Sequence, residues 1–180
     1  MVPRLITSLN KGRFFIGDDS MRKFKKISFE QFKKDIINDK KIYNEYELPI
    51  RSTLTSAGYD FKAISTFELK PGEIKKIPTG VKVQLNNDEF LMIVVRSSMG
   101  FKYNVRMCNQ IGIIDSDYYN NENNEGHIWI ALQNEGNKTY IVNRNDSFAQ
   151  GIILKYLTVD DEEKIINERI GGLGSTDKGE

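Results

Sequence analysis

The sequence predicts an all-β fold of the sandwich or jelly-roll type. From residue 50 onward apolar and polar residues alternate, most clearly in residues 81–85 and 128–132. Clusters of turn-forming residues lie between such runs, at residues 70–72, 86–88, 134–137 and 143–146. A period of two indicates strands with one buried face, and short strands separated by Gly, Pro, Asn and Asp are typical of a β-sandwich or jelly roll.

One helix is expected before the strands, at residues 28–41. Ser28 and Gln31 form a capping-box pattern, in which each side chain satisfies a backbone N–H of the first helical turn. Apolar residues then recur at helical spacing from Phe29 to Ile36, with lysines on the other face. We therefore expect this helix to pack its apolar face against the strands.

The composition divides the 180 residues into three parts. Residues 1–20 show no sustained period and are expected to be a leader or extension with a tendency to disorder. Residues 21–166 should form one β domain, which includes the helix, because a chain of this length can bury a sizeable core. Residues 167–180, in which four of the last ten residues are glycine, are expected to form a flexible C-terminal arm.

Charge and residue usage exclude several classes of protein. The chain has 26 Lys and Arg against 25 Asp and Glu, and this balance argues against direct nucleic-acid binding. The single cysteine, Cys108, excludes an internal disulfide and fits a reducing compartment, while the single histidine, His127, excludes His-rich metal sites. No apolar run approaches the roughly 18 residues of a membrane span. We expect a soluble, cytoplasmic protein without a membrane partner.

Five segments combine permissive backbone with polar groups. They are Ala57–Phe61, Arg96–Gly100, Gly112–Tyr118, Asp146–Gln150 and Arg169–Thr176. In the second segment, Arg96 can pair with phosphate oxygens, and backbone N–H groups near Ser97 and Ser98 can hold an anion. Alternatively, Arg96 supports the strand end through a carboxylate such as Asp60.

Asp115 follows two β-branched residues and precedes a turn, which places its carboxylate at a strand end. There it can deprotonate a water for attack on phosphorus, or it can be a turn aspartate that caps backbone N–H groups. The last segment offers glycines for close approach to a ligand and polar side chains for phosphate, although such a terminus is more often a frayed end.

In order and spacing, the five segments resemble the motifs of the trimeric dUTP diphosphatases (dUTPases), in the form seen in Gram-positive bacteria and their phages. The resemblance covers residues 50–176, and residues 22–49 more loosely. It implies a distorted jelly roll, a homotrimer with an exchanged C-terminal arm, and hydrolysis of dUTP to dUMP and pyrophosphate, which keeps uracil out of DNA.

The resemblance also implies which residues bind the uracil and the deoxyribose and which residue activates the attacking water. Asp115 matches the general base that activates water to attack the α-phosphorus. Tyr118 matches the tyrosine that packs under the deoxyribose and leaves no space for a 2′-hydroxyl. Asn109, together with hairpin backbone groups at Gly112 and Ile114, matches the part that reads uracil.

The remaining motif residues are implied to hold the triphosphate. Ser97 and Ser98 would contact phosphate, Arg96 would have a phosphate or structural role, and Gln150 would lie near the phosphates and the attacking water. Asp60 would meet Mg²⁺ through water, and the ion would arrive with dUTP because no cluster in the chain offers a metal cage. The arm would close over a neighbouring subunit's site with Arg169, Leu173, Gly174, Ser175 and Thr176.

Four features depart from the family pattern, and one of them is the spacing of Arg169, which lies four residues before Leu173 where many relatives place the arginine five before. Leu173 replaces a phenylalanine that stacks on uracil, which loses stacking energy. Ser147 stands where an arginine is usual, and Arg144 either compensates or is an exposed turn residue. Residues 120–125 are inserted before Gly126, and they are polar enough that we expect a loop tip outside the core.

Two other functions are considered. A dCTP deaminase shares the fold, but it needs a glutamate three residues before an asparagine that matches Asn134, and that position is Ala131. The other is a regulatory role, since phage dUTPases can bind host repressors, and the insertion and the first 50 residues offer surfaces for a protein partner. A sandwich without a ligand would leave five ordered motifs unexplained.

Overall fold

The computed structural model describes residues 22–162, which form mainly short strands. The strands are β1 (Lys23–Lys26), β2 (Ile50–Arg51), β3 (Tyr59–Lys62), β4 (Phe67–Leu69), β5 (Ile74–Pro78), β6 (Val81–Gln84), β7 (Glu89–Val95), β8 (Val105–Met107), β9 (Gly112–Asp115), β10 (Trp129–Asn134), β11 (Tyr140–Val142) and β12 (Ser147–Lys155). The helices are α1 (Phe29–Asp35), α2 (Lys40–Glu45), α3 (Ser97–Tyr103) and a 3₁₀ turn, η1 (Ser116–Tyr118). The predicted all-β class is confirmed.

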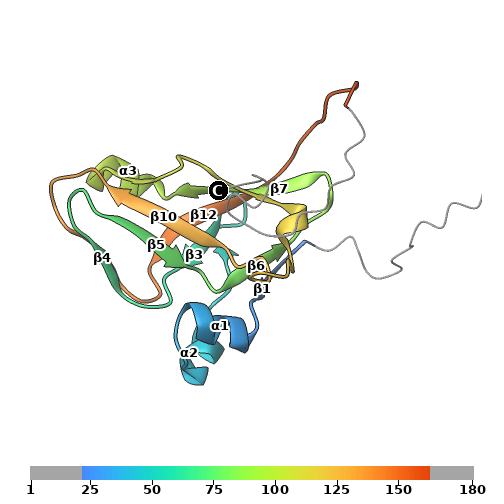
Figure 1. The fold of residues 1–180 in the computed structure, drawn as a ribbon. Coiled ribbons are helices and arrows are strands. Elements are labelled where there is room, and N and C mark those ends of the chain that lie inside the picture. Colours follow the sequence, from blue (N-terminus) through green and yellow to red (C-terminus); the bar gives the residue numbers. More distant parts are fainter. Residues whose placement is uncertain (1–21, 163–180) are drawn as a thin grey trace, which may run out of the picture.

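Two antiparallel sheets form the body of the fold (Figure 1). The larger sheet has the strand order β2-β3-β12-β7-β9, and the smaller has the order β5-β10-β8. Two further pairs, β1 with β6 and β4 with β11, extend the structure at its margins. Within the larger sheet β7 pairs with β12 over its whole length and with β9 over residues 90–93.

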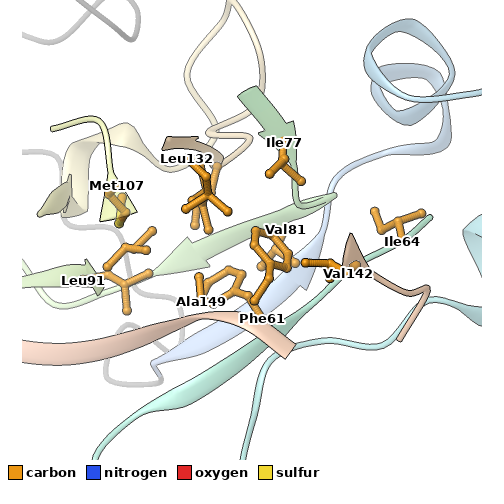
Figure 2. Close-up of a cluster of buried hydrophobic side chains, with 14 of the residues drawn as sticks. Phe61, Ile64, Ile77, Val81, Leu91, Met107, Leu132, Val142 and Ala149 are labelled. Carbon is orange, nitrogen blue, oxygen red and sulfur yellow. The ribbon is translucent and has the colours of Figure 1, made fainter. Parts of the chain in front are cut away.

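The hydrophobic core lies between the two sheets. Figure 2 shows Leu132 and Ile77 of the smaller sheet above Phe61, Leu91 and Ala149 of the larger one. All five side chains are at most 6% exposed. Burying a leucine of this kind contributes roughly 1.5–3 kcal/mol. The alternating pattern in the sequence therefore corresponds to the face that each strand turns to this core.

The N-terminal helix differs from the prediction, because one helix over 28–41 is replaced by two short ones. Helix α1 ends where Ile36 leaves helical geometry, with φ −125° and ψ −75°. Asp39 adopts extended backbone, and its carboxylate accepts a hydrogen bond from the Ile42 N–H at 3.0 Å. A capping aspartate competes with helix continuation, so Asp39 starts α2 instead. No helix in residues 22–162 is long and apolar enough to cross a membrane.

The predicted capping box is half formed. Ser28 Oγ accepts a hydrogen bond from the Gln31 N–H at 3.1 Å, as expected. The reciprocal bond comes from Glu125, whose carboxylate accepts from the Ser28 N–H at 2.9 Å, while the Gln31 amide donates to Asp35 instead. A residue 97 positions away therefore completes the cap and attaches α1 to the loop at residues 120–125.

His127 is fully buried and joins α1 to the turn between β5 and β6. Its Nε2 accepts a hydrogen bond from the Gly80 N–H at 2.9 Å, and its Nδ1 lies 2.6 Å from the Asp35 carboxylate. Because Nε2 accepts, the proton of the neutral ring is on Nδ1, which donates to Asp35. This histidine is a structural connector between the two parts.

The burial of His127 predicts a dependence of stability on pH. Burial lowers the pKa of the imidazole and outweighs the opposite effect of Asp35. Below the unfolded value of about 6.5 the unfolded chain then binds more protons than the folded one, so the free energy of unfolding falls as pH drops from 7 to 5. The slope contributed by His127 is up to about 1.4 kcal/mol per pH unit.

Urea unfolding at several pH values between 5 and 7 measures this slope. His127→Gln keeps a neutral side chain that can donate and accept, so its slope should be shallower than that of the wild type. Equal slopes in the two proteins would show that His127 does not titrate on unfolding.

Candidate active site

The first, second and fourth segments meet at one end of the five-stranded sheet. Asp60 on β3 pairs with Gln150 on β12, and Gln150 pairs with Val94 on β7. Arg96 directly follows β7 and is the N-cap residue of α3. Three strands that are distant in sequence thus bring these side chains to one edge, which we call the phosphate cluster: Asp60, Arg96, Ser97, Ser98 and Gln150.

Arg96 is held by Asp60 of this cluster and by the backbone of Ser147. Its Nε lies 3.5 Å from Asp60 Oδ1, and its Nη1 donates to the Ser147 carbonyl at 3.5 Å. Asp60 also accepts a hydrogen bond from the Ser52 hydroxyl. The Asp60 side chain is 11% exposed and that of Arg96 is 38% exposed. The geometry favours the structural interpretation of Arg96, as a support between the ends of three strands.

Gly58 explains the close approach of the first segment to Gln150. A Cβ at this position would lie 2.5 Å from Gln150 Oε1 and 3.3 Å from its Cβ. Any larger residue would therefore displace the Gln150 amide. The glycine of the first motif leaves the space that this side chain occupies.

Ser97 and Ser98 form the exposed first turn of α3. The helix is attached to the core by Met99, which is 1% exposed, and its first backbone bond runs from the Met99 N–H to the Arg96 carbonyl at 3.0 Å. N–H groups of a first helical turn lack partners within the helix, and the positive end of the helix dipole favours anions. The position suits contact with a phosphate group.

A second group, which we call the base cluster, lies on β9 and in the turns on either side of it: Asn109, Gly112, Ile114, Asp115 and Tyr118. Asp115 ends β9 opposite Phe90 and begins η1, so the expected strand-end position is confirmed. Asn109 is exposed in the turn before β9. At Gly112 a Cβ would lie 3.2 Å from the Cβ of Ile93, so the glycine lets β9 lie close to β7.

The expected hairpin around Asn109 is not a hydrogen-bonded pair of strands. Among the described strands β8 pairs with β10, whereas β9 pairs with β7. The chain therefore crosses from the smaller sheet to the larger one between Met107 and Gly112. The prediction was wrong here because strand pairing depends on partners that are distant in sequence.

The two clusters are separated within one chain. Asp115 pairs with Phe90 and Gln150 pairs with Val94, four residues further along β7. Four residues of strand span about 13 Å and two strand spacings about 10 Å, so the two backbones are about 16 Å apart. Paired residues project from the same face of a sheet, so both side chains are on the outer face of the larger sheet.

Tyr118 and the loop after it form a hydrogen-bonded unit that the sequence did not predict. Tyr118 is 7% exposed; its hydroxyl donates to the His127 carbonyl at 3.1 Å and accepts from Asn124 Nδ2 at 2.8 Å. Asn121 is 8% exposed, so the expectation that residues 120–125 lie wholly outside the protein interior was wrong. The run of asparagines in the sequence was a signal for this compact loop, because asparagine side chains readily form hydrogen bonds with nearby backbone groups.

The remaining residues with an expected role are Arg144 and those of the C-terminal arm. Arg144 forms an ion pair of 2.8 Å with Glu45 on α2, which supports its interpretation as an exposed turn residue. The residues expected in the arm lie outside the described part of the chain: Arg169, Leu173, Gly174, Ser175 and Thr176. The expected leader at residues 1–20 also lies outside it.

Known proteins are similar to this chain in sequence. A family model described as dUTPase matches residues 44–178. A deoxyuridine 5′-triphosphate nucleotidohydrolase from Lactococcus lactis is 42% identical over 130 residues, which are 72% of this chain and 87% of that protein. The chain belongs to the dUTPase family. A Haemophilus influenzae nucleotidohydrolase of the same name is 35% identical over 117 residues, which are 63% of this chain and 74% of that protein.

Solved dUTPase structures agree on the fold. The Streptococcus mutans dUTPase superimposes with a TM-score of 0.59 at 39% identity, covering 63% of this chain and 88% of that one. The dUTPase of phage phi11 of S. aureus superimposes with a TM-score of 0.60, covering 82% and 97%, and at 20% identity it supports the fold alone. The predicted jelly roll of the dUTPase family is confirmed.

In residues 22–162 no three His, Cys, Asp or Glu side chains come together as a metal site. Asp60 has Ser52 and Arg96 as partners. Because a carboxylate offers about four acceptor positions, Asp60 can also accept a hydrogen bond from a water molecule bound to an ion. The described side chains thus fit a Mg²⁺ ion that is held mainly by oxygens of its own ligand.

The Arg96–Asp60 pair predicts a measurable coupling in stability. Arg96→Met leaves a largely buried carboxylate with Ser52 alone, and we expect a loss of about 1–2 kcal/mol, less than for a fully buried pair because Arg96 is partly solvated. Asp60→Asn should relieve part of that loss in the double variant. Urea unfolding of the four proteins gives the coupling energy. Strictly additive effects would mean that the pair contributes nothing.

Proposed function

We propose that this chain hydrolyses dUTP to dUMP and pyrophosphate. The observation that carries the proposal is the position of Asp115 and Tyr118, three residues apart at the end of β9, in a member of the dUTPase family. The relatives at 42% and 35% identity are named as enzymes that hydrolyse deoxyuridine 5′-triphosphate. A strand-end carboxylate and an adjacent, rigidly held aromatic ring match the chemistry and the selectivity that this reaction needs.

In the proposed reaction, the Asp115 carboxylate accepts a proton from a water molecule. The water oxygen forms a bond to the α-phosphorus, and the bond from that phosphorus to the oxygen bridging to the β-phosphorus breaks. Pyrophosphate leaves with the bonding electrons, and dUMP remains. Gln150 would lie near the phosphates and orient the attacking water, with Gly58 keeping space for its amide.

The nucleotide would be recognised by both clusters. Backbone groups at Gly112 and Ile114, with Asn109, would read the acceptor and donor pattern of uracil, and cytosine would leave donors facing each other. Ser97 and Ser98 would bind phosphate oxygens at the first turn of α3. Arg96 would hold this edge in place through Asp60 and contribute positive charge.

The expected metal and arm complete the proposal. Mg²⁺ would arrive with the triphosphate and neutralise charge on its oxygens, with Asp60 as the carboxylate that meets it through water. Arg169, Leu173, Gly174, Ser175 and Thr176 would close over the nucleotide. Leu173 would cover the uracil by apolar contact alone.

The separation of the clusters supports a site shared between subunits of a homotrimer. One chain keeps Asp115 and Gln150 about 16 Å apart, too far for both to contact one water molecule. Met92, Ile113 and Ile152 lie between them in register on the same outer face, and Ile113 is 54% exposed. Packing this apolar surface against another copy would bring one chain's base cluster to its neighbour's phosphate cluster.

The alternatives have less support. At the position where a deaminase needs glutamate, Ala131 lies in β10 opposite Lys76. Asn134 is the buried last residue of the same strand, and its side-chain amide donates to the Leu69 carbonyl at 2.8 Å. Phage dUTPases of known structure are described as controlling transfer of virulence genes. For this chain a regulatory protein partner stays a prediction, as does a cytoplasmic location.

Release of pyrophosphate and of ammonia from dUTP, dCTP, dTTP and UTP tests the function. We expect pyrophosphate from dUTP far above the others, and no ammonia. Asp115→Asn should lower turnover by at least about 100-fold without unfolding, because an amide cannot take the proton. Asp117→Asn, an exposed neighbour in the same turn, is the matched control and should stay within about threefold of wild type.

Near-normal turnover by Asp115→Asn would require another base. Ammonia from dCTP would replace the proposal with a deaminase, and no product from any nucleotide would leave a protein without this activity.

A further inference from the structure

We propose that Asn124, in the inserted loop of residues 120–125, is a positioning residue for Tyr118 and thereby sets the preference for deoxyribose over ribose. The inference rests on the proposed role of Tyr118 beneath the sugar. It adds a function for the insertion, in which Asn124 bonds to the Tyr118 hydroxyl and Asn121 to the Tyr118 carbonyl.

The Tyr118 hydroxyl has a defined partner on each side. It donates to the His127 carbonyl at 3.1 Å and accepts from Asn124 Nδ2 at 2.8 Å. Because the ring is 7% exposed and its hydroxyl is engaged both as donor and as acceptor, any tilt of the ring would break a buried hydrogen bond. Tyr118 is therefore fixed at its outer end as well as at its backbone.

The orientation of the Asn124 amide is itself determined by the loop. Its Oδ1 accepts from the Gly126 N–H at 3.1 Å and from Asn121 Nδ2 at 2.9 Å. With two donors at the oxygen, the NH₂ group faces Tyr118 and must be the donor to its hydroxyl. Asn121 also restrains the backbone of Tyr118, because its Nδ2 donates to the Tyr118 carbonyl at 2.9 Å.

The loop is attached to the rest of the domain through Glu125. The carboxylate accepts from the Ser28 N–H at 2.9 Å and from Lys82 Nζ at 3.0 Å, and the Glu125 carbonyl accepts from the Asn120 N–H at 3.0 Å. Burial raises the pKa of Glu125, but the hydrogen bonds from Ser28 and Lys82 outweigh it and leave the pKa below its ordinary value. The ionised group thus joins α1, β6 and the loop.

The other partner of Tyr118 is equally fixed. The His127 carbonyl belongs to a residue whose ring is held between the Gly80 N–H and the Asp35 carboxylate. Both bonds to the Tyr118 hydroxyl therefore end on groups that packing and further hydrogen bonds keep in place. A ring fixed in this way excludes one extra hydroxyl oxygen, whereas a ring able to tilt would make room for it.

The test compares kcat/KM for dUTP and for UTP. Asn124→Leu keeps the approximate shape but removes the donor to Tyr118, together with the oxygen that accepts from Gly126 and Asn121. We expect the dUTP-to-UTP ratio to fall about tenfold, mainly through faster use of UTP; tenfold corresponds to about 1.4 kcal/mol. Asn123→Leu makes the same change at an exposed position in the same loop and should leave the ratio unchanged. Thermal unfolding shows that each variant is folded.

Tyr118→Phe tests the bond from the other side without altering the loop, and it also removes the bond to the His127 carbonyl. It should lower the ratio at least as much as Asn124→Leu, and Asn124→Leu added to Tyr118→Phe should lower it no further, because the bond between the two side chains is already absent. A general loosening of the loop would instead give additive losses, and this outcome would overturn the inference. An unchanged ratio in Tyr118→Phe would overturn it even where Asn124→Leu fails to fold.

Tyr118→Ala separates this inference from the proposal on which it rests. If Tyr118→Ala leaves the ratio unchanged, the sugar is selected elsewhere and the role proposed for Tyr118 is wrong. If Tyr118→Ala lowers the ratio and Asn124→Leu does not, the sugar site stands and the positioning role of Asn124 is wrong.

Discussion

The register of β7 with its two neighbours is the constraint on which the site depends. Hydrogen bonding to β9 puts Asp115 opposite Phe90, and hydrogen bonding to β12 puts Gln150 opposite Val94. Because a slip by one residue would turn every core side chain outward, the buried face of β7 fixes both pairings. The same packing that stabilises the sandwich thus holds Asp115 and Gln150 at a set distance on one outer face.

A second set of contacts links α1 to the loop that holds Tyr118. Asp35 and Ser28 belong to or cap α1, and they bond to His127 and Glu125 on either side of Gly126. These two residues frame the end of the inserted loop, whose asparagines hold Tyr118. Helix α1 therefore supports a loop whose own turns are determined by short polar side chains.

The sequence predicted what depends on local pattern. Alternation predicted the strands, Ser28 predicted a helix start, and two β-branched residues before Asp115 predicted a strand end. It did not predict the helix break at Asp39 or the inward fold of residues 120–125, because each depends on competition between local hydrogen bonds and distant partners. The sequence left two interpretations of Arg96, contact with phosphate or support of the strand end through Asp60. The pairing of β3, β12 and β7, which brings Arg96 next to Asp60, is what favours the second.

Mixed trimers test the central claim, that one site takes its base and its phosphate-binding groups from different chains. Asp115→Asn chains would be combined with chains in which Ser97, Ser98 and Gln150 are replaced by alanine, and mixed trimers purified through two different tags. In a three-fold ring of shared sites, one site in each mixed trimer has both clusters intact, so we expect about one third of wild-type turnover. Turnover no higher than that of the parent variants, or a solution mass of 20.7 kDa for the wild type, would contradict the claim.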